Sequence, residues 1–267
     1  MRAIARALLA AALTAVPAAA GAWPAETVVA MTRDARRLLP RSLNRLLGER
    51  ESQVKDELQR FSPQLAQRVF ADLPSGRLSA PTLEALQAEV DRVAAMLHEG
   101  RLSEGLPRLG ALARIPADLS DPMLTAGPEG WPPGLAREYY ALFSANVSRM
   151  PVVLEDRAVL DTPRQQLPAL WQSVLDRSRA QAPTVRAEMI RDGRVVSAAR
   201  LDYRSPAWAV SSLAYSRAVA AVAATWLAAW RSANGDLTNQ PGTRVAVPRD
   251  APAPTADARR PPQPEAP

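Results

Sequence analysis

Apolar residues recur at steps of three and four along most of this chain. The clearest case begins at Ser79 and Pro81 and ends at Gly100. Its apolar face comprises Leu83, Leu86, Val90, Val93 and Leu97. Aromatic residues make up only 5% of the chain and 25 prolines outnumber 12 glycines, which is unlike a sandwich or barrel of aromatic strands with glycine turns. We therefore predict an all-α fold.

The same spacing predicts other helices and one domain. The segments with this period span residues 27–38, 43–61, 63–71, 106–113, 135–148, 167–179 and 207–232. We expect the core to be built by the helices at 27–38, 82–98, 135–148 and 207–232. Residues 151–205 are less regular, and the part from Val195 to Tyr203 fits either a helix or a short strand.

The most apolar segment after the first 22 residues runs from Ala207 to Trp230. Its uninterrupted apolar stretch starts at Ala218, after Arg217, and is shorter than the roughly 20 residues that cross a bilayer. A buried core helix is therefore preferred to a membrane-spanning one, so that no transmembrane helix is expected in the mature chain. Asn234 and Gly235 supply its C-terminal stop.

Both ends of the chain have compositions of their own. Residues 1–22 combine Arg2 and Arg6 with an apolar run and small residues, the pattern of a secretory signal peptide cleaved after Ala20 or after Ala22. Export places the protein in a periplasm or outside the cell. Residues 23–236 form the predicted helical domain, and residues 237–267, which are rich in proline, are predicted to be a disordered tail.

The counts of cysteine and histidine exclude several kinds of metal and catalytic site. The chain has no cysteine and one histidine, so thiolate sites and sites with several histidines are ruled out. His98 ends a predicted helix, where a solvated side chain is the simplest interpretation. Loss of Arg2 and Arg6 lowers the net charge from +6 to +4, too little to require a polyanion, so a nucleic-acid partner is not expected.

One segment carries a recognisable motif. Residues 109–124, LGALARIPADLSDPML, resemble the central motif of the zinc-dependent phospholipase C superfamily, which also includes single-strand nucleases with three zinc ions. In that family a helix carries His-x-x-x-Asp, and Pro-x-His follows the next turn. Asp118 and Pro122 match the family residues, whereas Arg114 and Leu124 stand where the family has histidines.

The resemblance extends along most of residues 23–236. Cleavage after Ala22 makes Trp23 the first mature residue, and the family begins with a tryptophan whose amino group and carbonyl bind zinc. Val28 stands where the family has a histidine, and Ala136 and Tyr140 stand at its His-x-x-x-Glu. The resemblance thus implies the family's helical fold, with Trp23 and Asp118 as residual metal positions.

Because most of the family's zinc ligands are replaced in this chain, the function that we expect differs from that of the family. Zinc hydrolases hold their metal through several imidazoles and carboxylates and leave one position open, which Trp23 and Asp118 alone do not provide. Pro116 removes a helical donor between Arg114 and Asp118, which would pair across one turn if the helix continues. We expect no catalytic residue and no cofactor, and a binding module for a lipid head group or another phosphorylated species. The alternative is a working phosphoric-ester hydrolase of phospholipase C or nuclease type, whose zinc is held by Asp, Glu and backbone atoms.

Overall fold

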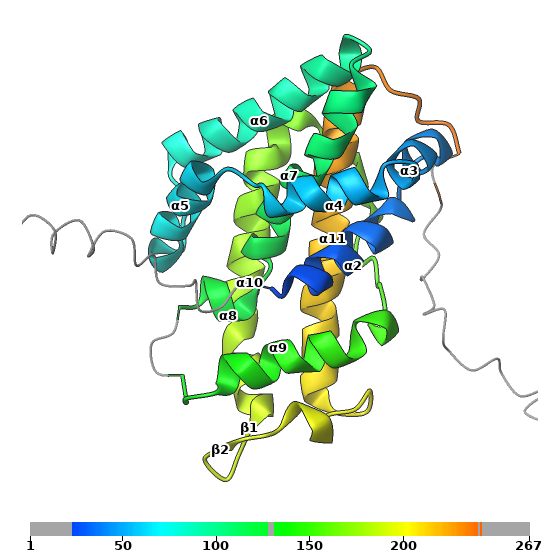
Figure 1. Ribbon diagram of the computed structural model, residues 1–267. Helices are drawn as coiled ribbons and strands as arrows, with labels where there is room; N and C mark the ends of the chain where they lie inside the picture. The colour runs from blue at the N-terminus through cyan, green and yellow to red at the C-terminus, as the bar shows by residue number, and fades with distance from the viewer. Residues whose placement is uncertain (1–22, 128–130, 240, 242–267) are drawn as a thin grey trace, which may run out of the picture.

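Two long antiparallel helices, α10 (Leu167–Met189) and α11 (Pro206–Ser232), run side by side through the centre of the molecule (Figure 1). The structure is a computed structural model that describes residues 23–127, 131–239 and 241. These residues form a mostly helical single domain of about ten helices. The prediction of an all-α domain is confirmed at this level.

Helix α11 is the most buried element. From Ala218 to Trp230 its side chains are buried on every face except at Ala220, against α2, α6, α7 and α10. It is also the one helix in the described residues that is long and apolar enough to cross a membrane, but most of its apolar window is buried inside the domain. This is the burial that a core helix requires. The chain after α11 packs closely against the helix, because a Cβ at Gly235 would collide with the Trp230 ring.

The N-terminal half supplies five helices that cover this centre. They are α2 (Ala25–Arg36), α3 (Arg41–Gly48), α4 (Glu51–Gln59), α5 (Pro63–Asp72) and α6 (Ala80–His98). The prediction of one helix over residues 43–61 was wrong, since the chain turns between α3 and α4. Gly48 ends α3 where a Cβ would lie 2.5 Å from the Arg36 guanidinium, which in turn bonds Glu51 at 3.0 Å.

Helix α7 (Leu102–Leu119) runs through Pro107 and Pro116 without ending. It crosses α4 so closely that a Cβ at Gly110 would lie 2.0 Å from the carbonyl oxygen of Val54. The short helix α8 (Pro122–Thr125) and then α9 (Leu135–Asn146) follow. The predicted helix at 106–113 is therefore longer at both ends, and the one at 135–148 is confirmed except for its last turn, which is a 3₁₀ turn.

The segment that the sequence left open contains short 3₁₀ turns and one hairpin. The turns within residues 151–205 are Arg157–Asp161, Arg164–Gln166 and Ala198–Arg200, and two more lie outside this segment, Leu73–Ser75 before α6 and Val147–Arg149 after α9. The strands β1 (Ile190–Arg191) and β2 (Arg194–Val195) pair antiparallel around Asp192 and Gly193, both with positive φ. This is the tight turn that Asp-Gly favours, and it forms the end of the molecule opposite α6 (Figure 1).

Two predictions concern the ends of the chain. The signal peptide at residues 1–22 lies outside the described residues, and so does the tail apart from residues 237–239 and 241.

Candidate functional site

A buried polar cluster lies where the end of α7, the start of α8 and the middle of α9 meet. We call it the aspartate cluster and define it by Arg114, Asp118, Asp121 and Tyr140. Three of these, Arg114, Asp118 and Tyr140, are positions that the sequence analysis singled out, and Tyr140 lies 22 residues after Asp118. Arg114 pairs with Asp118, and Tyr140 bonds Asp121 close enough to Asp118 for the charge of Asp118 to raise the pKa of Tyr140.

Arg114 and Asp118 form an ion pair within α7. The Arg114 Nε donates to Asp118 Oδ2 at 2.8 Å, and the two side chains are only 19% and 5% exposed. The pairing expected from their spacing is confirmed, because α7 continues through Pro116 and keeps both on one face. Burial raises the pKa of Asp118, while the charge and hydrogen bond of Arg114 oppose that shift.

Asp121 is held by three hydrogen bonds. It caps the N-terminus of α8, where its Oδ1 accepts from the backbone N–H of Met123 at 2.9 Å and of Leu124 at 3.4 Å. Its Oδ2 accepts from the Tyr140 hydroxyl at 2.9 Å. Complete burial, with a smaller contribution from the charge of Asp118, raises the pKa of Asp121 to about 8. A carboxyl group with this pKa is mostly protonated at neutral pH.

Trp23 closes the cluster from the side of the N-terminus. It is 2% exposed, and its indole N–H donates to the carbonyl oxygen of Ala117 at 2.8 Å. Its ring packs edge-on against Phe143, with centroids 4.5 Å apart, and lies 5.7 Å from the ring of Tyr139. The side chain alone therefore anchors residue 23 between α7 and α9.

The remaining positions of the resemblance carry only hydrocarbon side chains. Val28 is fully buried in α2, while Leu124 in α8 and Ala136 in α9 are partly buried. Ala136 lies one turn before Tyr140. None of these three side chains offers an atom that binds a metal.

The donor set does not fit zinc. A zinc site needs three or four protein ligands, and the described residues contain no group of three or more His, Cys, Asp or Glu side chains that could hold a metal. One Asp118 oxygen is bonded to Arg114, and the other has no hydrogen-bond partner in the described residues. Both Asp121 oxygens are already bonded. The guanidinium of Arg114 also places a fixed positive charge beside the carboxylate.

Asp121 was not among the residues singled out from the sequence, and its bond to Tyr140 was not foreseen. Asp before Pro at a helix start does indicate a cap, and Asp121 is one. Its bond to a tyrosine 19 residues later depends on how α9 packs. His98 is exposed at the end of α6, as expected.

A separate open cavity of about 490 Å³ lies beside the C-terminal half of α10. Its walls include Trp131, Arg179 and Arg186, and none of the four residues of the aspartate cluster lines it. The sequence analysis singled out none of these three residues. Two arginines seven apart on a helix were the available signal, because that spacing places them on one face.

No protein-family model, curated protein or solved structure matches this chain.

Proposed function

We propose that this chain is an exported, non-catalytic binding module built on a phospholipase C-like helical scaffold. In this proposal the aspartate cluster occupies the former metal site. The module binds its ligand without zinc and without chemistry on the ligand. A lipid head group or another phosphorylated molecule is the ligand class that the resemblance suggests.

The observation that carries this proposal is the bond from Arg114 Nε to Asp118 Oδ2 at 2.8 Å. It places an internal cation against the one carboxylate that the motif retains. Asp121 contributes no second charge at neutral pH, because burial keeps its carboxyl group protonated. The site is therefore balanced by its own side chains, with no charge left for a divalent cation to neutralise.

Enzyme assays test the loss of catalysis. The purified full chain is incubated with phosphatidylcholine vesicles or single-stranded DNA, with and without added zinc. We expect no hydrolysis above that of the heat-denatured chain under any condition. Zinc-dependent release of products that a chelator stops would overturn the proposal in favour of a phosphoric-ester hydrolase.

A rebuilt variant tests the scaffold itself. It combines five substitutions that restore the family's ligands: Val28→His, Arg114→His, Leu124→His, Ala136→His and Tyr140→Glu. If the scaffold is the proposed one, the rebuilt chain takes up zinc and is stabilised by it, whereas the single variant Arg114→His takes up none. A rebuilt chain that is helical by circular dichroism yet takes up no zinc would contradict the resemblance.

A further inference from the structure

The cavity beside α10 combines apolar walls with two positive charges. Trp131 forms one side, and Ala126, Ala182 and Ile190 contribute further apolar surface. Arg179 and Arg186 supply the charge, and no acidic side chain is among the described residues that line it. The ion pairs between described residues all involve other cations.

Arg179 is held in a fixed position. Its Nη1 donates to the carbonyl oxygens of Leu73 at 2.6 Å and Thr125 at 2.7 Å. Gly76, at φ 73°, leaves room for this guanidinium, since a Cβ there would lie 2.9 Å from Arg179 Nε. The hydroxyls of Thr125 and Ser178 lie 2.9 Å apart and join α8 to the same turn of α10. The charge of Arg179 is therefore positioned before any ligand arrives.

Arg186 differs from Arg179 because it is exposed. It lies two turns further along α10 on the same face, close to Ile190 at the start of the hairpin. A guanidinium in such a place donates parallel hydrogen bonds to an oxyanion. The volume of about 490 Å³ lies within the range of small-molecule sites, which are mostly apolar with a few polar anchors.

We propose that this cavity binds an amphipathic anion, a molecule whose carboxylate or phosphate lies between Arg179 and Arg186 and whose apolar body packs on Trp131. This inference rests on the proposed function and names its binding site and ligand class. The apolar walls distinguish such a ligand from a free inorganic anion. The two arginines distinguish it from an uncharged amphiphile.

Calorimetric titration of the purified full chain tests the ligand class with four probes below their micelle-forming concentrations. The probes are dodecanoate, dodecyl phosphate, dodecyl glucoside and inorganic phosphate. We expect the two anionic amphiphiles to bind one per chain, and the glucoside and free phosphate to bind at least about tenfold more weakly. Binding of dodecyl phosphate alone would narrow the ligand to phosphate-bearing amphiphiles and support the proposal. Equal binding of the glucoside, or of free phosphate, would overturn it.

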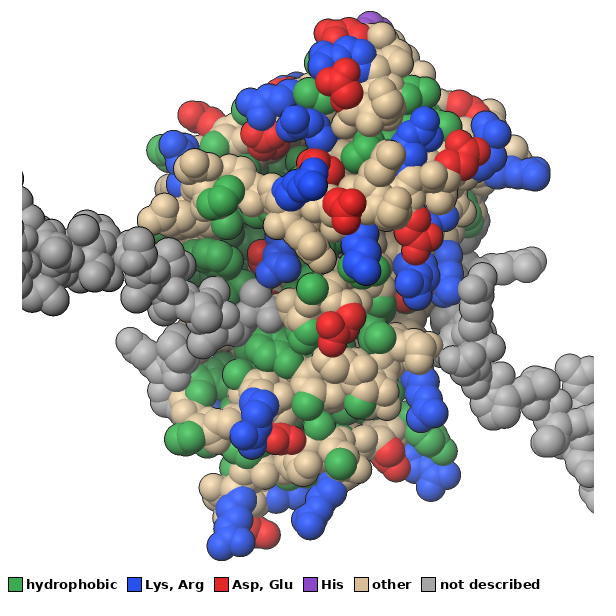
Figure 2. All heavy atoms as spheres, in the orientation of Figure 1, with side chains coloured by type: hydrophobic (Ala, Val, Ile, Leu, Met, Phe, Trp, Pro, Cys, Tyr) green, Lys and Arg blue, Asp and Glu red, His purple; other side chains and the backbone are tan. Residues whose placement is uncertain are grey.

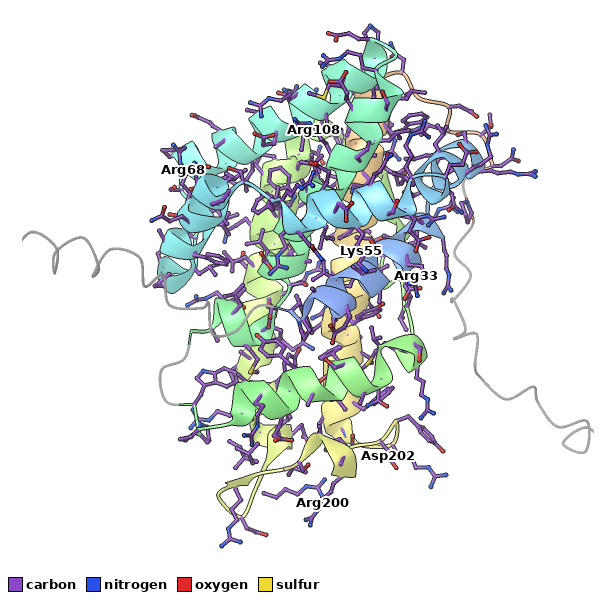
Figure 3. The ribbon with its side chains drawn as sticks, in the orientation of Figure 1. Arg33, Lys55, Arg68, Arg108, Arg200 and Asp202 are labelled. Carbon is purple, nitrogen blue, oxygen red and sulfur yellow. The ribbon has the colours of Figure 1, made fainter. Side chains whose placement is uncertain are left out.

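Variants locate the binding site. Arg186→Gln should lower the affinity for both anionic amphiphiles by about tenfold, and Arg186→Lys should recover part of that loss. Trp131→Ala should lower the affinity by a similar factor. Arg68→Gln is the matched control, because Arg68 is exposed on α5 at the end of the molecule away from the hairpin (Figure 3). Unchanged affinity in both pocket variants would overturn the assignment. Zinc analysis of the same samples reports on the proposed function separately, since metal content and amphiphile binding are independent readouts.

Discussion

Two aspartate–tyrosine hydrogen bonds in this domain have similar lengths and different surroundings. In one, the Tyr215 hydroxyl of α11 donates to Asp34 of α2 at 2.7 Å. In the other, the Tyr140 hydroxyl of α9 donates to Asp121 at 2.9 Å. Burial raises the pKa of both carboxyl groups. The pairs differ in the charges placed next to them.

Asp34 lies near the surface with cations beside it. Its side chain is 13% exposed, Arg37 bonds it at 2.9 Å, and Arg37 and Arg33 both act to lower its pKa. Asp121 is fully buried, and its charged neighbour is the like-charged Asp118. The Asp34–Tyr215 pair is therefore a partly exposed hydrogen bond with cations beside it. In the second pair, burial and a like charge both raise the pKa of the carboxyl group.

Charged side chains of both signs are mixed over the face of the molecule shown in Figure 2, whereas the charged group that raises the pKa of the buried Asp121 is the like-charged Asp118. Matched substitutions at the two pairs test this difference.

The largest expected difference is in pH dependence. The Asp121 carboxyl group titrates with the ordinary aspartate pKa of 3.8 in the unfolded chain and with a pKa of about 8 in the folded one. Between these values the folded state holds one more proton, so its stability falls as pH rises, by about 1.4 kcal/mol per pH unit, and is constant above about pH 8. Asp121→Asn should remove this slope and be more stable than the parent at pH 8.

Urea unfolding from pH 4 to pH 9 measures this effect. Asp34→Asn is the control, and we expect a smaller change of slope because Arg37 and Arg33 already favour its ionised form. Equal slopes in the parent and in Asp121→Asn would contradict the buried proton.

The next largest loss of stability is expected when the arginine beside an aspartate is replaced. Arg114→Met leaves Asp118 buried without its partner, and we expect a loss of about 3 kcal/mol in the free energy of unfolding. Arg37→Met should cost under about 1 kcal/mol, because Asp34 keeps Tyr215 and some contact with water. The double variant Arg114→Met with Asp118→Leu should recover most of the loss. Comparable losses in the two single variants would show that the Arg114 pair is no more than a surface contact.

A smaller loss of stability is expected when the hydroxyl group of either tyrosine is removed. Tyr140→Phe removes the donor to a fully buried oxygen, and we expect a cost of about 2 kcal/mol at pH 6. Tyr215→Phe should cost about 1 kcal/mol, since Asp34 retains Arg37. Thermal unfolding of the two variants in parallel compares them. A larger loss at Tyr215 would reverse the ranking of the two pairs.

The sequence predicted those parts of the fold that depend on local pattern. The three-four spacing located α2, α6, α9 and α11, and the four-residue step from Arg114 to Asp118 predicted their ion pair. Two local signals were available and were not used. Gly48 indicated the break between α3 and α4, and Asp192-Gly193 indicated the hairpin.

The rest depends on tertiary packing. No sequence spacing brings Tyr140 to Asp121, or places Trp131 and Arg186 on the walls of one cavity, because both depend on how segments before and within α9 lie against α8 and α10. The continuity of α7 through Pro116 is also a tertiary effect. The cost of the missing backbone donor is offset by burial of the helix on several sides.

The zinc content of the purified chain is the most direct test of whether the aspartate cluster balances its own charge. The chain is expressed in zinc-supplemented medium, purified without chelator, and analysed for metal. Its thermal unfolding is then recorded with and without a chelator. We predict zinc far below one per chain and an unchanged unfolding temperature. One or more zinc ions per chain, with an unfolding temperature that falls on chelation, would contradict it.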